Sequence, residues 1–128
     1  MSDYKQLDVW KKAHVVTMEI YALTKSFPVE ERFGLVTQMR RAAVSIGANL
    51  AEGRGRRGDP EFGRFIRIAL GSAYELQYEL LVAADAGYIP RDNFSKLDSE
   101  LERIGKMLWA LLERVQKSAA AAGVAGSR

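Results

Sequence analysis

The chain has 128 residues, the size of one domain with a single core, and its apolar and charged fractions, 48% and 27%, are those of an ordinary globular protein. It contains no cysteine, which excludes disulfides, zinc–thiolate sites and thiol nucleophiles and fits a reducing compartment. The sequence has no run of about 18 apolar residues, and its polar first residues lack the apolar core of a signal peptide, so we expect a cytoplasmic location.

The positive charge is concentrated in one segment, residues 38–67. This segment has seven arginines against three acidic residues, a net charge of +4, whereas the whole chain carries +3. The arginines are Arg40, Arg41, Arg54, Arg56, Arg57, Arg64 and Arg67. Charge gathered in one segment favours an anionic partner, so these arginines are the candidate nucleic-acid-binding residues.

Residues 7–27 are predicted to form the first helix, because apolar residues recur at spacings of three and four. One stripe contains Leu7, Trp10, His14, Met18 and Tyr21, and a second contains Val9, Ala13, Val16, Ile20, Leu23 and Phe27. We interpret Trp10 and Met18 as core side chains. Two apolar stripes on one helix also suggest an additional partner surface. Phe27–Pro28 ends the helix, because proline disfavours the α conformation in the residue before it.

Residues 30–53 are predicted to form the second helix, with Glu30 and Glu31 in its first turn. Its core stripe is Leu35, Met39, Ala42, Ile46 and either Asn49 or Leu50. Beside it, Ala43, Gly47 and Ala51 form a row of small residues, which predicts a close crossing with a neighbouring helix. Asn49 lies near the buried stripe, where we expect a polar side chain satisfied by a hydrogen-bond partner.

The sequence GRGRRG at residues 53–58 is predicted to be an exposed, mobile turn. Gly53 suits a left-handed helix C-cap, and Asp59 and Pro60 suit the N-cap and first position of the next helix. The turn lacks the GxxxxGK[ST] pattern of a phosphate-binding P-loop and follows no strand. Its arginines are therefore exposed cations without a nucleotide-binding motif.

Residues 60–86 and residues 90–117 are predicted to form the third and fourth helices. Arg64 and Arg67 lie in the first two turns of the third helix, where cations oppose the helix dipole. This arrangement suits either a bound anion or a solvated basic face. Tyr74 and Tyr78, one turn apart, are candidates for packing on a neighbour.

The fourth helix carries an unbroken heptad from Phe94 to Val115. Four helices joined by short turns predict an all-α fold, an up-down-up-down antiparallel four-helix bundle over residues 1–117. The Ala/Gly-rich residues 118–128 are expected to be a disordered tail.

No catalytic or metal site can be assembled from these residues. A di-iron site in a bundle needs two Glu-x-x-His motifs, and the chain has one histidine, His14, with Lys11 three residues before it. His14 lies on an apolar stripe, as a packed core histidine does. Glu75 and Glu79 could meet Arg40 or Arg41 across the bundle, but acid–base catalysis by paired carboxylates needs a cleft, and nothing in the sequence indicates one. We therefore expect no enzyme activity, no cofactor and no metal.

The second helix and the turn carry a specific motif. It consists of Phe27-Pro28-x-Glu30-Glu31-x-Phe33-Gly34-Leu35, then Gln38-Met39-Arg40-Arg41-Ala42-Ala43-Val44-Ser45-Ile46, then Asn49-Leu50-Ala51-Glu52-Gly53. Leu7-x-Val9-Trp10-x-Lys12-Ala13 precedes it, and Phe62-x-x-Phe65-x-x-x-Ala69-x-Gly71-Ser72-x-x-Glu75-Leu76 follows it. Over residues 4–117 the chain resembles the four-helix bundle family named after proteins encoded in intervening sequences of bacterial 23S rRNA genes.

This resemblance implies a cytosolic bundle that assembles into a closed ring, typically a homopentamer, with a basic channel. Related proteins include accessory factors of diversity-generating reverse transcriptases, which bind nucleic acid and the polymerase. By the same resemblance, Arg40, Arg41, Asn49, Glu52 and Gly53 are family-motif positions. The chain departs from the family pattern at Gly47-Ala48, where the family usually has a proline followed by a small residue, so any bend in the helix is expected to be softer.

Two functions remain open. One is a ring that binds nucleic acid, RNA before DNA, by phosphate contacts without base readout. The other is a protein-interaction scaffold, or an accessory factor for a polymerase or reverse transcriptase. In the second case the arginines would meet an acidic protein, and binding would weaken less steeply with salt.

Overall fold

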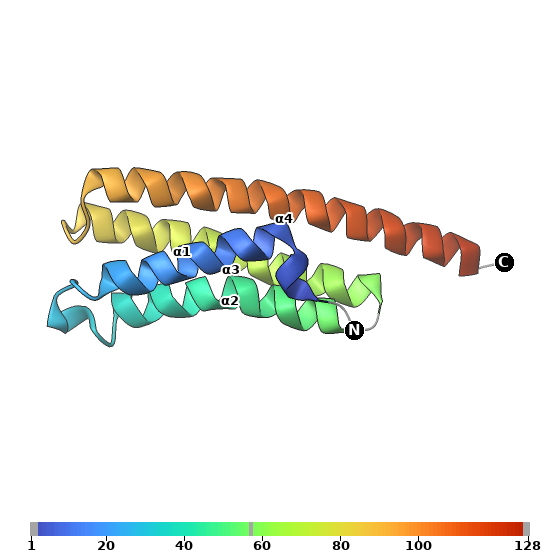
Figure 1. Ribbon diagram of the computed structural model, residues 1–128, viewed down its shortest axis with the longest axis horizontal. Coiled ribbons are helices and arrows are strands. Elements are labelled where there is room, and N and C mark those ends of the chain that lie inside the picture. Colours follow the sequence, from blue (N-terminus) through green and yellow to red (C-terminus); the bar gives the residue numbers. More distant parts are fainter. Residues whose placement is uncertain (1–2, 57, 127–128) are drawn as a thin grey trace.

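The computed structural model describes residues 3–56 and 58–126, and within them the chain is an all-α four-helix bundle, as the sequence predicts (Figure 1). The helices are α1 (Asp8–Thr24), α2 (Leu35–Gly55), α3 (Asp59–Asp85) and α4 (Arg91–Gly126). Two short 3-10 helices, η1 (Tyr4–Gln6) and η2 (Val29–Glu31), precede α1 and α2. In the described part of the chain, α1 packs on α2 and α4, and α3 packs on the same two helices.

The core follows the predicted periodicity on three of the helices. On α4 the heptad residues Leu97, Leu101, Ile104, Leu108 and Leu111 are buried. The row of small residues on α2 faces α1, where the Thr17 hydroxyl lies 3.1 Å from the Ala43 carbonyl oxygen. A Cβ atom on Gly47 would lie 3.2 Å from Nε1 of Trp10, so the absence of a side chain on Gly47 lets the Trp10 ring pack against α2. The predicted close crossing is confirmed.

Only one of the two apolar stripes of α1 is in the core. Val9, Ala13, Val16 and Ile20 are at most 4% exposed, whereas Met18 is 55% exposed. The prediction that Met18 is a core side chain is therefore wrong. The neighbouring helices α2 and α4 cover only one side of α1, and the stripe that contains Val9, Val16 and Ile20 lies on that side. Trp10 and Tyr21 are half-buried.

The start of α2 differs from the prediction. Glu30 and Glu31 lie in η2, and α2 begins at Leu35 behind Gly34, which offers no side-chain cap. The Glu31 carboxylate supplies the cap instead, because it accepts the Leu35 backbone N–H at 3.2 Å. Its other oxygen accepts the Tyr88 hydroxyl at 2.9 Å. Glu31 thus ties the start of α2 to the turn before α4.

The turn between α2 and α3 is shorter than predicted. Gly53 is helical and buried, and α2 continues to Gly55, so the prediction of a left-handed cap at Gly53 is wrong. The left-handed residue is Gly58, with φ of 88°, and it caps α3 in place of the predicted Asp59. Gly53 lies within the helix, where Phe65 occupies the space that a Cβ atom would take.

The last helix continues past Lys117, where the sequence predicts its end, to Gly126. The run Ala119–Ala122 explains this difference, because alanine has the highest intrinsic helix propensity. The segment extends beyond the ends of the other three helices (Figure 1).

We predict that Gly53→Ala destabilises the bundle. A Cβ atom there would lie 2.6 Å from the Phe65 Cβ and 3.0 Å from the Phe62 Cδ1. Overpacking of this kind costs about 1–3 kcal/mol, which outweighs the gain of about 1 kcal/mol in helix propensity. Urea denaturation measures the change. The matched control is Gly71→Ala, within α3, which has nothing within 4 Å and should be neutral or stabilising. Equal stability of the two variants would contradict the prediction.

Candidate functional site

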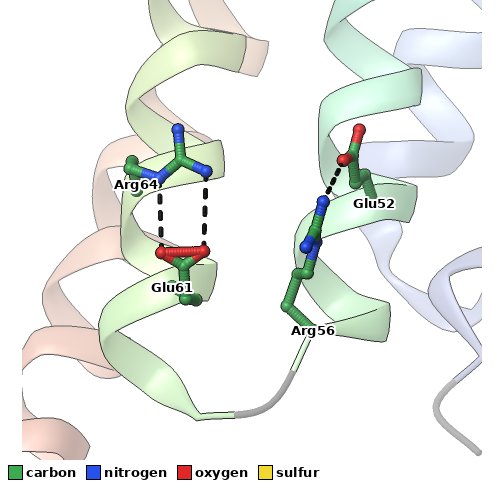
Figure 2. Close-up of polar contacts among 4 residues, drawn as sticks. All are labelled: Glu52, Arg56, Glu61 and Arg64. Carbon is green, nitrogen blue, oxygen red and sulfur yellow. Dashed lines mark hydrogen bonds and ion pairs between the residues drawn. The ribbon is translucent and has the colours of Figure 1, made fainter.

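The candidate site is the end of the bundle where α2 meets α3. Figure 2 shows two arginine–carboxylate pairs on either side of the turn. Arg56, just after α2, donates to Glu52 at 2.6 Å, and Arg64, in the second turn of α3, lies 3.4 Å and 3.5 Å from the two oxygens of Glu61. Each pair joins residues three or four apart, so it forms along its own helix and does not bridge the turn.

The arginines also lie over two aromatic rings. The guanidinium of Arg54 is 5.6 Å from the centre of the Phe62 ring, and those of Arg56 and Arg64 are 5.4 Å and 4.5 Å from the centre of the Phe65 ring. Both rings are buried in the core. We call Arg54, Arg56 and Arg64 the arginine cluster. Cation–π contacts hold its guanidinium groups near one another and at the surface.

The carboxylates that pair with Arg56 and Arg64 are easy to replace. Side chains in both pairs are about half exposed, between 45% and 56%, and surface ion pairs of this kind contribute little to the stability of a protein. A guanidinium has five N–H donors in a planar fork that matches a phosphate group. A phosphate can therefore take the place of Glu52 or Glu61 at little cost.

The structure does not bring every predicted arginine to this cluster. Arg40 is half-buried: it donates to the Thr24 hydroxyl at 2.9 Å and to the Tyr21 carbonyl oxygen at 3.2 Å, and it lies 4.5 Å from the centre of the Tyr21 ring. Arg40 therefore fastens α2 to the end of α1.

Two further arginines lie outside the cluster. Arg41 is exposed on α2, roughly 20 Å along the helix from Arg54. Arg67 is exposed one turn after Arg64. Arg57 lies outside the described residues.

The family-motif residue Asn49 bonds within α2, and its partner Ser45 joins α2 to α3. The Asn49 side-chain amide donates to the Ser45 carbonyl oxygen at 2.8 Å and to its hydroxyl at 2.9 Å, which confirms Asn49 as a satisfied polar residue. The Ser45 and Ser72 hydroxyls are hydrogen-bonded at 2.8 Å across the two helices. This bridge has no signature in the sequence, because two serines among small residues form no distinct pattern. The motif therefore positions the helices that present the arginine cluster.

Glu79 is a buried acid on α3, two helical turns after Ser72 and on the same face of the helix. It is 5% exposed, and its Oε1 atom has no hydrogen-bond partner among the residues that the structure describes. Burial, followed by a hydrogen bond with Glu75 and repulsion from it, raises the pKa of Glu79 to about 8. At neutral pH the side chain is therefore mainly protonated. None of the hydrogen bonds and ion pairs seen for Arg40 joins it to Glu75 or Glu79.

Neither a metal-binding group nor a membrane-spanning helix is found within residues 3–56 and 58–126. This part of the chain holds no group of three or more His, Cys, Asp or Glu residues that could bind a metal ion. None of its helices is long and apolar enough to cross a membrane. His14 is exposed and stacks on Trp10, with ring centres 5.1 Å apart and planes at 7°. The expectation that His14 is a core residue is wrong, because its stripe is the one that α1 leaves outside.

Comparison with known proteins gives a family match and several similar solved structures, among them one crystal structure. A family model described as 23S rRNA-intervening sequence protein matches residues 5–110. No curated protein matches the chain. The crystal structure, at 1.70 Å resolution, is of a protein of unknown function from the S23 ribosomal protein family of Bacteroides thetaiotaomicron VPI-5482. It has 27% sequence identity and a TM-score of 0.76, over 82% of this chain and 95% of that chain.

We predict that Glu79 makes the bundle less stable as pH rises. The folded state keeps a proton on Glu79 that the unfolded state, with a pKa near 4.5, releases. The contribution of Glu79 to the free energy of unfolding is therefore fully present below pH 4.5 and is lost as the pH rises to about 8. Urea denaturation across this range should show a smaller decline for Glu79→Gln than for the wild type. Glu113→Gln, an exposed position on α4, should behave as the wild type, and an unchanged slope in Glu79→Gln would refute the raised pKa of Glu79.

Proposed function

The chain belongs to the 23S rRNA-intervening sequence protein family, and from that premise we propose that it is a non-enzymatic, cytoplasmic bundle that assembles into a homopentameric ring and binds nucleic acid. RNA is the first candidate ligand. Binding is through backbone phosphates, without base-specific contacts. The bundle offers none of the recognition motifs that read bases, such as an RRM, a KH domain or a helix-turn-helix.

The observation that carries this proposal is the arginine cluster. Three guanidinium groups from two helices lie over two neighbouring rings at one end of the bundle. Arginines held in this way lose little side-chain entropy when they bind. Their carboxylate partners are exposed and easily replaced. Phosphate contacts fix the position of a nucleic acid and carry no sequence information.

Assembly strengthens the same effect. The segment 38–67 carries +4, so five copies bring about +20 to one particle. Neutralising phosphates releases the counterions that surround a nucleic acid, and this release drives binding. A ring thus converts a modest charge per chain into a strong electrostatic surface.

A second candidate function is a protein-interaction scaffold, such as an accessory factor for a polymerase or reverse transcriptase. The exposed apolar side chains favour it: Phe33 is 88% exposed and Tyr78 is 67% exposed. An apolar protein interface depends weakly on salt, whereas phosphate contacts depend on it steeply. The salt dependence of binding therefore separates the two functions.

We predict that the purified protein binds a fluorescently labelled structured RNA with an affinity that falls steeply from low to physiological salt. Replacement of Arg54, Arg56 and Arg64 by alanine should weaken binding at every salt concentration. The slope of log affinity against log salt should fall by about 0.7–0.9 for each phosphate contact that is lost. Fluorescence anisotropy measures both quantities. The variant that replaces Arg54, Arg56 and Arg57 tests the turn itself.

Arg91→Ala is the matched control. Arg91 is also an exposed arginine that pairs with a carboxylate, Asp85 at 2.8 Å, and lies over a ring, Phe94 at 5.9 Å, but it lies at the turn between α3 and α4. Its replacement should leave the salt slope unchanged. Absence of RNA binding by the wild type at low salt would exclude the proposed function, and a protein partner would then be sought.

A further inference from the structure

An open groove runs between α1 and α2. Its volume is about 390 Å³, and its lining includes Trp10, His14, Met18, Tyr21, Val44 and Gly47. Met18 and Val44 are 55% and 44% exposed although both are apolar. Gly47, Ala48 and Ala51 of α2 have side chains too small to fill the surface between α1 and α2, so the groove stays open. We call this feature the α1–α2 groove.

Exposed aromatic side chains line the seam between α3 and α4. Tyr74, Tyr78 and Trp109 are 49%, 67% and 52% exposed, and Trp109 donates its indole N–H to the Tyr74 hydroxyl at 2.8 Å. We call these three residues the aromatic ridge. In the described bundle α1 does not pack on α3, nor α2 on α4, so the groove and the ridge lie on opposite faces. One chain thus carries an apolar hollow and an apolar projection that cannot meet each other.

Charges beside the two features are of opposite sign. Lys25, Arg32 and Arg40 line the hollow at the end of α1, and Arg40 lies against Tyr21 of the groove. The groove and this hollow have no acidic lining residue among those described. Beside the ridge, Gln77 holds the carboxylates of Asp98 and Glu102, at 3.3 Å and 3.1 Å. Arg103 and Lys106 also lie near Glu102. The complementarity is therefore between the Asp98 and Glu102 carboxylates and the basic hollow, and not between the two whole faces.

The two features also lie at the same height along the bundle. Thr17 is level with Ala43, and Ser45 is level with Ser72, because hydrogen bonds join these pairs across the helices. Met18 and Val44 therefore lie within about one helical turn of Tyr74 in height. By the same spacing Arg40 is level with Gln77. Copies placed side by side and pointing the same way would bring ridge to groove and base to acid at once.

We propose that the aromatic ridge of one copy docks in the α1–α2 groove of a second copy, with Arg40 and Lys25 facing Asp98 and Glu102. This inference rests on the proposed ring and names the two surfaces that form it. Contact between two different faces is heterologous, so each copy keeps one free groove and one free ridge until a ring closes. The aromatic residues supply apolar area, and the charges set the register.

The test is the mass of the full chain in solution without nucleic acid, by size-exclusion chromatography with light scattering. The wild type should have a mass several times the 14.3 kDa of one chain. Met18→Glu removes the groove and Tyr78→Glu removes the ridge, and each variant alone should fall to 14.3 kDa. An equimolar mixture should form a dimer and nothing larger, because one variant keeps its ridge and the other its groove.

Val15→Glu is the matched control. Val15 is on the same helix as Met18 and is equally exposed, 55%, but it lies toward α4 beside Lys12 and Glu100. This variant should keep the mass of the wild type. Circular dichroism checks that every variant retains its helices.

A monomeric wild type, or unchanged mass in Met18→Glu and Tyr78→Glu, would overturn the proposal. So would a dimer of Tyr78→Glu alone, because the groove would then pair with a second groove. Anisotropy with the labelled RNA on the same samples separates this result from the proposed phosphate binding. A monomeric wild type that still binds RNA refutes the docking alone, and an intact wild-type ring that does not bind RNA refutes the phosphate contacts alone.

Discussion

The close approach of α2 and α3 at Gly53 is the constraint on which the rest of the structure depends. The missing Cβ lets the Phe65 side chain lie directly against the α2 backbone. Phe62 and Phe65 then complete the end of the core and at the same time offer their rings to three arginines. Core packing and surface charge are thus coupled, because a shift of α3 away from α2 would remove the support under the guanidinium groups.

The two proposed activities occupy different parts of the molecule. The arginine cluster lies at one end of the bundle, whereas the groove and the ridge lie on its sides. The proposed side-by-side assembly would therefore leave the clusters accessible and gather them at one end of a ring. Exposed carboxylates next to the cluster keep the free protein's charge balanced, and a phosphate can replace them with little loss of stability.

The sequence predicts the fold well because long helices with a strong apolar period leave few alternatives. The small row on α2 and the role of Asn49 were also predictable from residue size and polarity. Exposure of Met18 and His14 was not, because periodicity shows which residues share a stripe and not which stripe a neighbouring helix covers. Nor could spacing reveal that Arg40 would bind the end of α1, since its partners Thr24 and Tyr21 lie on another helix.

The central claim is that the arginine cluster itself binds phosphate. The most direct measurement is NMR of the arginine Nε–H groups during titration with a short RNA at constant salt. We expect the signals of Arg54, Arg56 and Arg64 to shift together and saturate, whereas that of Arg40, already bonded to Thr24, should not shift. Saturating shifts confined to other arginines, such as Arg91, would contradict it, and the phosphate site would then lie elsewhere on the bundle.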